Sequence, residues 1–150
     1  MRKAFWLIPA ILFVVDRLLK ATALSGLSFS LIGKAVRFTL FKNGGIAFSL
    51  PLSGPVVWIV TALILAAVLS SAWKDWKLGI KANFTAYTLF ALGAASNLID
   101  RVAYGYTDDY LIFFSRSAVN LADGMILAGA LWLAFGPMAE HPAKEKTPVA

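Results

Sequence analysis

The chain contains no cysteine and only one histidine, so several kinds of catalytic and metal chemistry are not expected. Without cysteine there is no disulfide bond, no thiol nucleophile and no cysteine-bound zinc. The single histidine, His141, stands in a polar C-terminal stretch, and we interpret it as solvated and inert. No Gly-x-Ser-x-Gly sequence occurs either, which argues against an ordinary serine hydrolase. Aspartate carboxylates are the leading candidates for acid–base chemistry.

Charged residues are also scarce, at 15% of the chain, whereas hydrophobic residues make up 59%. A typical soluble domain has about 25% charged residues and about 45–50% apolar ones, so this composition indicates a membrane protein. The net charge of +6 does not indicate nucleic-acid binding, because the basic residues are scattered and form no dense patch. Asp100, Asp109 and Asp123 could in principle bind a hard metal ion, but their spacing is not specific. No metal and no other cofactor is expected.

Four segments are long and apolar enough to cross a bilayer, which takes about 20 residues of helix. They cover about residues 5–24, 56–73, 82–99 and 121–138. The first segment resembles a secretory signal, but Asp16, Arg17 and Lys20 separate its apolar core from a possible cleavage site, so we interpret it as an uncleaved helix. The prediction is an all-α membrane protein with four transmembrane helices in one domain, residues 1–138.

The distribution of lysine and arginine predicts the orientation of these helices. The short loop between the second and third segments contains Lys74, Lys77 and Lys81. Cytoplasmic loops carry the excess of basic residues, and an even number of spans puts both ends of the chain on one side, so both termini are expected in the cytoplasm. The polar tail, residues 139–150, is expected to be a disordered cytoplasmic extension.

The connection between the first two segments, about residues 25–55, is expected to be extracytoplasmic and rich in β-structure. Val36, Phe38 and Leu40 alternate with more polar residues, which is the period of a strand. Asn43 and the two glycines that follow it are a strong turn signal. We therefore expect a small pair of strands resting on the outer surface of the membrane.

Polar residues gather at the predicted outer ends of the helices, where ionisable groups beside a membrane span often indicate function. Asp16 and Lys20 lie near the end of the first segment. Being four residues apart, they could also simply pair on one helix face. The third segment ends in Asn97, Asp100 and Arg101, which share a helix face and could simply terminate the span. Both alternatives stay open for these residues taken alone.

Asn120 and Asp123 open the fourth segment, and Asp109 lies in the loop before it. Asn120 and Asp123 have the spacing of a helix N-cap and its third residue, so capping is an alternative to chemistry. However, two carboxylates held close together cannot both ionise cheaply, so that one keeps a proton. Such a pair can activate water and protonate a leaving amine. Asp109 and Asp123 could form this pair because they come from neighbouring segments.

Four motifs, in this order along the chain, resemble those of lipoprotein signal peptidase (signal peptidase II), a family of bacterial four-span aspartyl proteases. The motifs are Asp16-x-x-x-Lys20, Asn43-Gly44-Gly45-Ile46-Ala47-Phe48, Asn97-Leu98-Ile99-Asp100-Arg101 and Asn120-Leu121-Ala122-Asp123. Each motif is weak alone, but the four together are specific. The chain departs from the family pattern where Ser96 replaces glycine, Thr107 replaces valine and Val119 replaces phenylalanine.

The resemblance implies a role for each motif residue. Asp109 and Asp123 would be the catalytic pair, with Asp108, interpreted as a solvated loop residue, as the reserve candidate for the first role. Residues implied to bind substrate or orient the site are Asn43, Gly45, Asn97, Asp100, Arg101 and Asn120, with Asn43 and Arg101 holding the substrate backbone and Asp100 and Asn97 orienting Arg101. Asp16 and Lys20 would give structural support.

The implied activity is removal of the signal peptide from diacylglyceryl-modified prolipoproteins, by cleavage before the lipidated cysteine. The implied partners are this substrate, membrane lipid and inhibitors of the globomycin type, and a monomer is expected. The implied location is the bacterial cytoplasmic (inner) membrane, with the site toward its outer face. A small proton-coupled transporter is the main alternative, because intramembrane carboxylates also carry protons. A non-catalytic membrane scaffold is a third possibility.

Overall fold

The computed structural model describes residues 7–45, 54–78 and 83–136. It contains four helices: α1 (Leu7–Leu24), α2 (Gly54–Lys77), α3 (Phe84–Tyr104) and α4 (Leu121–Phe135). These helices agree with the four predicted apolar segments, although α2 and α3 run further than predicted at their C-terminal ends. The predicted tail 139–150, His141, Lys81 and the motif residues Ile46, Ala47 and Phe48 lie outside the described residues.

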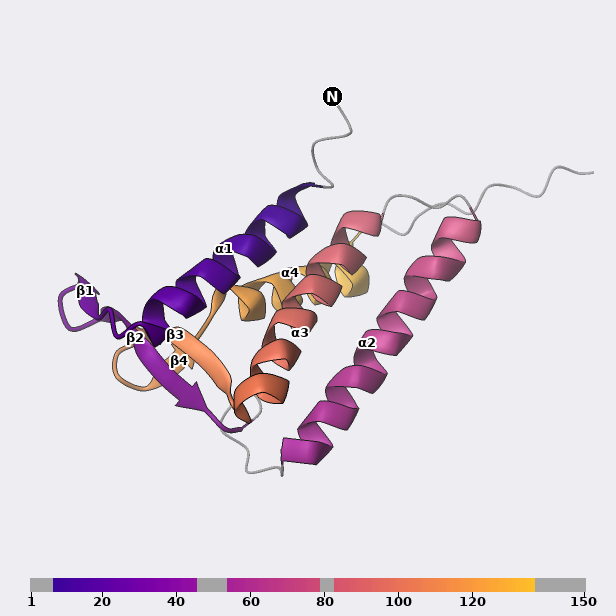
Figure 1. Cartoon of the computed structure of the whole chain (residues 1–150). Coiled ribbons are helices and arrows are strands. Elements are labelled where there is room, and N and C mark those ends of the chain that lie inside the picture. Colours follow the sequence, from indigo (N-terminus) through magenta and orange to yellow (C-terminus); the bar gives the residue numbers. More distant parts are fainter. Residues whose placement is uncertain (1–6, 46–53, 79–82, 137–150) are drawn as a thin grey trace, which may run out of the picture.

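A four-stranded antiparallel sheet lies at one end of the helices, beside the C-terminal end of α1 (Figure 1). Its strands, in spatial order, are β1 (Phe29–Ile32), β2 (Val36–Asn43), β3 (Thr107–Phe113) and β4 (Ser117–Val119). A strand pair between α1 and α2 is therefore present as β1 and β2, but the turn between them lies at residues 33–35 and not at the predicted Asn43-Gly44-Gly45 turn. The all-α prediction was too narrow, because the stretch between α3 and α4, interpreted as a loop, supplies the other two strands.

The turn from α3 into β3 depends on Gly105. This residue has a φ of 83°, in the left-handed region that favours glycine, and its backbone N–H donates to the carbonyl of Arg101 at 2.9 Å. The chain then reverses at once into β3, which pairs with β2. As a result the end of α3, the strand β3 and the start of α4 lie close together.

The sheet packs on α1 through a small apolar cluster of Ala23, Phe38 and Tyr110, each at most 4% exposed. The rings of Phe38 and Tyr110 lie 5.5 Å apart. Most large apolar side chains of the helices, in contrast, point outward: examples are Leu18, Leu63 and Leu127, which are all at least 60% exposed. The buried interior is unusually polar, which is the inverse of a soluble protein.

Helices α3 and α4 approach each other closely at two glycines. A Cβ at Gly93 would lie 2.6 Å from the carbonyl oxygen of Ala122, and one at Gly129 would lie 2.7 Å from the carbonyl oxygen of Ala86. Small residues allow such contact between helix backbones, which is the usual way that helices pack in membranes. The two glycines thus set the distance between the helix that ends in the Asn97–Arg101 motif and the helix that opens with Asp123.

We expect Gly129→Ala to lower stability by about 1–3 kcal/mol, because the added methyl group meets backbone atoms that cannot rotate away. Gly124→Ala is the matched control, since a Cβ at Gly124 meets nothing within 4 Å. Thermal unfolding of both variants in the same detergent measures the difference. Equal melting temperatures for the two variants would show that α3 and α4 are not in this close contact.

Candidate active site

The first turn of α4 is the centre of the site, and its backbone amides bond to side chains from three other parts of the chain. The N–H of Leu121 donates to the Tyr110 hydroxyl at 2.9 Å, and the N–H of Ala122 donates to Asp16 Oδ1 at 3.1 Å. The N–H of Asp123 donates to Asn120 Oδ1 at 2.8 Å. These amides have no partner inside the helix, so a buried helix start requires such acceptors.

Asn120 and Asp123 form the predicted N-cap. The Asp123 carboxylate accepts the Asn120 backbone N–H at 3.1 Å, which completes a capping box with the bond from Asp123 N–H to Asn120. The capping interpretation is thus correct, but it does not replace the chemical one. The same Asn120 also donates from Nδ2 to Asp109 Oδ1 at 2.6 Å. Asn120 therefore contacts both carboxylates of the predicted pair.

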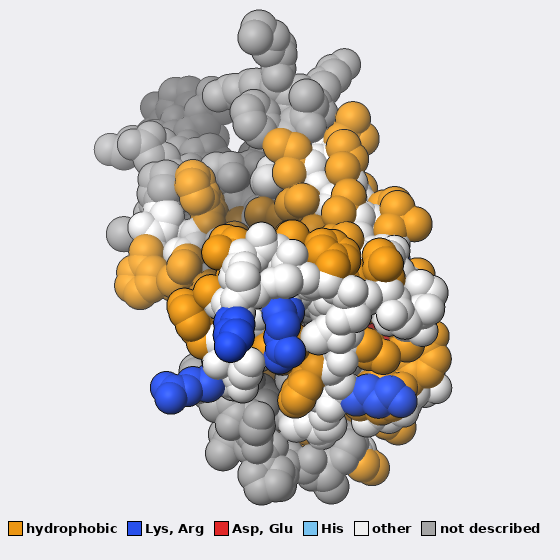
Figure 2. Space-filling model, turned by 90° about the vertical axis from the view of Figure 1, so that its left-hand side faces the viewer, with side chains coloured by type: hydrophobic (Ala, Val, Ile, Leu, Met, Phe, Trp, Pro, Cys, Tyr) orange, Lys and Arg blue, Asp and Glu red, His pale blue; other side chains and the backbone are white. Residues whose placement is uncertain are grey.

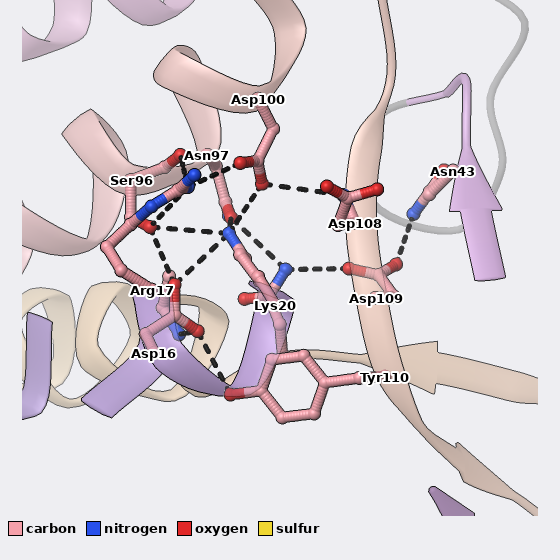
Figure 3. A network of polar contacts seen from close by, with 12 residues as sticks. Asp16, Arg17, Lys20, Asn43, Ser96, Asn97, Asp100, Asp108, Asp109 and Tyr110 are labelled. Carbon is pink, nitrogen blue, oxygen red and sulfur yellow. Dashed lines mark hydrogen bonds and ion pairs between the residues drawn. The ribbon is translucent and has the colours of Figure 1, made fainter. Parts of the chain in front are cut away.

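Each oxygen of the two carboxylates accepts a hydrogen bond. Asp109 Oδ2 accepts from Asn43 Nδ2 at 2.8 Å (Figure 3), and Asp109 Oδ1 accepts the bond from Asn120. Asp123 Oδ1 accepts from Asn97 Nδ2 at 2.8 Å. Asp109 is 1% exposed, whereas Asp123 is only half-buried. The structure thus brings both predicted carboxylates to one place and fixes their orientation through amides.

Burial has an electrostatic consequence for Asp109. Loss of hydration raises the pKa of its carboxyl to about 7, against the lowering effect of its bond from Asn43. The nearby charge of Asp123 raises this pKa as well. A carboxyl that holds its proton up to neutral pH is suited to donate it during a reaction.

The buried Lys20 side chain connects α1 to the motif residues of α3. Its ammonium group lies 2.6 Å from Asp100 Oδ2 and 3.1 Å from Asp16 Oδ2, and it donates to Asn97 Oδ1 at 2.9 Å (Figure 3). Because Asn97 Oδ1 faces this ammonium, its Nδ2 must face Asp123. The predicted pairing of Asp16 with Lys20 is present. Both residues are fully buried, and each also contacts other residues of the site.

Asp100 and Arg101 are less closely coupled than the resemblance implied. Asp100 forms ion pairs with Arg17 and Lys20, and among the described contacts none joins it directly to Arg101. Arg101 instead donates from Nη2 to the backbone carbonyl of Gly45 at 3.4 Å. The Gly45 N–H in turn donates to Asn43 Oδ1 at 3.1 Å. Arg101, Gly45 and Asn43 therefore form one edge of the site, next to Asp109.

Asp108 is not the solvated loop residue that we expected. It lies within β3 and is completely buried, and neither carboxyl oxygen has a hydrogen-bond partner among the described residues. Its backbone N–H donates to Asp100 Oδ2 at 3.4 Å. Burial, and then the charge of Asp100, raise the pKa of Asp108 above its usual 3.8. The loop prediction for Asp108 was wrong because two adjacent acidic residues are typical of a solvent-exposed loop.

Three further residues of the site were not singled out as site residues from the sequence. Arg17 pairs with Asp100, and Ser96 donates to Asp16 Oδ2 at 2.6 Å. Tyr110 donates its hydroxyl hydrogen to Asp16 Oδ1 at 3.0 Å while accepting from α4. Each of them neighbours a motif residue in the sequence, which is the one signal that could have indicated them. Within the described residues, no group of three or more acidic or histidine side chains is arranged to hold a metal ion.

Helices with an apolar exterior and a buried cluster of carboxylates, amides and cations define a membrane enzyme of the carboxylate-dependent class. Comparison with known proteins supports this class. The family description "Signal peptidase (SPase) II" matches residues 8–138. A lipoprotein signal peptidase of Allorhizobium ampelinum is 36% identical over 138 residues, covering 82% of this chain and 83% of the relative. One from a Nostoc species is 32% identical, covering 97% and 96%.

A solved structure has the same fold. A bacterial membrane enzyme determined by the in meso method superposes with a TM-score of 0.73 at 22% identity, covering 100% of this chain and 96% of that one. The chain belongs to the signal peptidase II (lipoprotein signal peptidase) family. It is an aspartic peptidase of the bacterial membrane that processes prolipoproteins.

Asp108→Asn should fold at least as stably as the wild type at neutral pH, with a gain of up to about 3 kcal/mol. Because the pKa of Asp108 is raised in the folded protein, folding favours the protonated acid, and wild-type stability falls relative to the variant as the pH rises above 3.8. Melting temperatures of both proteins at about pH 4 and about pH 7 test this. A variant that is much less stable at neutral pH would mean that Asp108 is ionised and paired.

Proposed function

We propose that Asp109 and Asp123 are the catalytic pair of this peptidase. Their two carboxylates share Asn120 as a common hydrogen-bond donor, and this juxtaposition is the observation that carries the proposal. In the proposed mechanism Asp109, whose pKa burial raises to about 7, holds the proton, and the less buried Asp123 is the ionised partner. The ionised carboxylate takes a proton from water as the water attacks the scissile carbonyl. The protonated carboxyl then supplies the hydrogen that the departing amine requires.

The surrounding residues fix the positions of these two carboxyl groups. Asn43, Asn97 and Asn120 donate hydrogen bonds to the carboxylate oxygens of this catalytic pair, which we call the dyad. These amides stay neutral in every protonation state of the two carboxyls. Amides fixed in this way hold the reacting groups without reorganising during the reaction. Asn43 and Arg101, at the edge of the site beside Gly45, are proposed to hold the backbone of the substrate. Asp16 and Lys20 act as the buried support behind the pair.

The proposed arrangement in the membrane has all four helices crossing it, with both termini in the cytoplasm and the sheet outside. Only one helix of the described residues, Pro55–Lys77, is long and apolar enough by itself, and the apolar Leu121–Phe135 is shorter. Helices α1 and α3 carry ionisable groups, but Asp16, Lys20 and Asp100 are fully buried and paired with one another. The lipid-facing surface of these helices is thus apolar, as the bilayer requires. The whole of residues 1–138 would form this single domain.

The proposed substrate is a prolipoprotein that carries a diacylglyceryl group, cut just before its lipidated cysteine. The acyl chains would stay in the bilayer while the scissile peptide bond meets water, so catalysis belongs at the membrane surface. Asp109 and Asp123 lie where the C-terminal end of α3, the start of α4 and the sheet meet, and in the proposed arrangement this is the outer surface of the membrane. Membrane lipid and inhibitors of the globomycin type are further proposed partners, and no cofactor is needed.

A proton-coupled transporter is disfavoured by the distribution of the buried charges. Transport sites lie near the middle of the membrane at breaks in the helices. Here the buried ionisable groups collect at one end of the bundle, around the start of α4, and α1, α3 and α4 are continuous across their described lengths. The clustering supports a site that meets substrate at a surface.

Cleavage by the reconstituted protein tests the dyad. With a lipidated prolipoprotein as substrate, Asp109→Asn and Asp123→Asn should each lower kcat by about 100- to 10,000-fold, the usual contribution of a positioned acid or base. Asp108→Asn is the control and should stay close to wild type, because its side chain contacts neither carboxylate of the pair.

Retained globomycin binding would show that the inactive variants are folded. Full activity in Asp109→Asn together with none in Asp108→Asn would transfer the first catalytic role to Asp108. Full activity in Asp123→Asn would end the dyad proposal.

A further inference from the structure

The far end of the sheet carries an exposed surface that the peptidase chemistry does not use. Two turns meet there, one between β1 and β2 and the other between β3 and β4. The Phe114 N–H donates to the Ala35 carbonyl at 2.8 Å, and Arg37 donates from Nη2 to Ser115 Oγ at 3.2 Å. We call this the hairpin-tip surface, and it consists of Leu31, Ile32, Lys34, Arg37, Phe114 and Arg116.

Apolar side chains on this surface are far more exposed than a soluble protein would allow at one place. Phe114 is 70% exposed, Ile32 is 65% exposed and Leu31 is 50% exposed. Phe114 also has a φ of 49°, in a region that bulky residues rarely adopt. The turn therefore holds an aromatic ring outward at a conformational cost. Strained, exposed positions of this kind are usually kept for contact with something else.

The charges of the hairpin-tip surface all have one sign. Lys34, Arg37 and Arg116 are exposed, and none of them forms an ion pair with a described residue. The stretches 27–45 and 111–119 contain no aspartate or glutamate at all. Figure 2 looks onto this side of the molecule and shows lysine and arginine side chains among apolar ones. An acidic, amphipathic partner would complement this surface.

The position of the surface favours a membrane over a protein as that partner. In Figure 1, β1 lies to the side of the helices, beyond α1, and not on top of them. The neighbouring end of α1 and the chain after it expose Leu18, Leu24 and Leu27. A sheet that projects sideways from the outer end of an apolar helix would meet the headgroup layer beside that helix. Basic residues with apolar anchors are the usual composition of interfacial membrane contacts.

We propose that the hairpin-tip surface binds anionic phospholipid headgroups of the outer leaflet, with Phe114 and Ile32 inserted at the acyl boundary. The proposal rests on the membrane arrangement given under the proposed function. Lys34, Arg37 and Arg116 contact the phosphates. This contact fixes the sheet, and with it Asn43 and Asp109, at the level of the membrane surface.

A fluorescent probe at the tip tests the contact directly. Because the chain has no cysteine, Ser115→Cys provides a single site for an environment-sensitive dye. The labelled protein is placed in nanodiscs of phosphatidylcholine alone or of phosphatidylcholine with phosphatidylglycerol, and quenching by brominated lipid is measured. We expect at least twofold stronger quenching with phosphatidylglycerol, and loss of this difference at high salt, which screens the charges.

Two charge variants complete the experiment. Lys34→Gln/Arg37→Gln/Arg116→Gln should remove the effect of phosphatidylglycerol, whereas Lys74→Gln/Lys77→Gln, at the other end of the bundle, should keep it. Equal quenching in both lipid mixtures, or an unchanged effect in the triple variant, would overturn the proposal. So would a probe that responds to added prolipoprotein but not to lipid, because the surface would then belong to the substrate. Cleavage is not the readout, so loss of the proposed dyad would leave this result intact.

Discussion

The start of α4 is buried, and the need to satisfy its backbone amides shapes everything around it. An amide without a partner in such a place costs about 1–3 kcal/mol, so acceptors must be delivered from elsewhere in the chain. Asp16 comes from α1, Tyr110 from β3 and Asn120 from the residue before the helix. Meeting this requirement brings α1 and β3 to the same point as α4. The position of Asp109, next to Tyr110 on β3, follows from it.

The same requirement explains the buried cations. Asp16 would be an unpaired charge in an apolar bundle if Lys20 did not lie 3.1 Å away. Lys20 also neutralises Asp100, and Arg17 forms a second ion pair with Asp100. Through Asn97 the same ammonium group fixes the amide that faces Asp123. Helix capping, charge compensation and orientation of the predicted catalytic carboxylates are thus parts of one network, and Figure 3 shows the part of it around Lys20 and Asp100.

The sequence predicted the helices well, because apolar length is a local signal, and the structure brings most of the motif residues together at one place. Residues 36–40 showed a strand through their alternation, and β2 is present. In β3 the adjacent Asp108 and Asp109 obscured the alternation that indicates a strand. Two consecutive carboxylates normally indicate a solvent-exposed loop, but both are buried here. The partners of Asp100 were also out of reach, because Arg17 and Lys20 lie about eighty residues away in the sequence. Contacts at such distances depend on how helices pack, and no local pattern encodes them.

The proposed mechanism requires that the resting enzyme at neutral pH holds one proton on its two catalytic carboxyls, on Asp109, while Asp123 is ionised. Infrared spectra of the Asp108→Asn protein, recorded against pH, test it without interference from Asp108, a further buried carboxyl whose pKa is raised. One protonated carboxyl band should be present below about pH 7 and disappear above it, together with kcat, because Asp109 then loses its proton. The band should be absent from Asp108→Asn/Asp109→Asn. If both carboxyls are instead ionised already at about pH 5, with activity unchanged through neutral pH, the pair holds no proton and the dyad mechanism is contradicted.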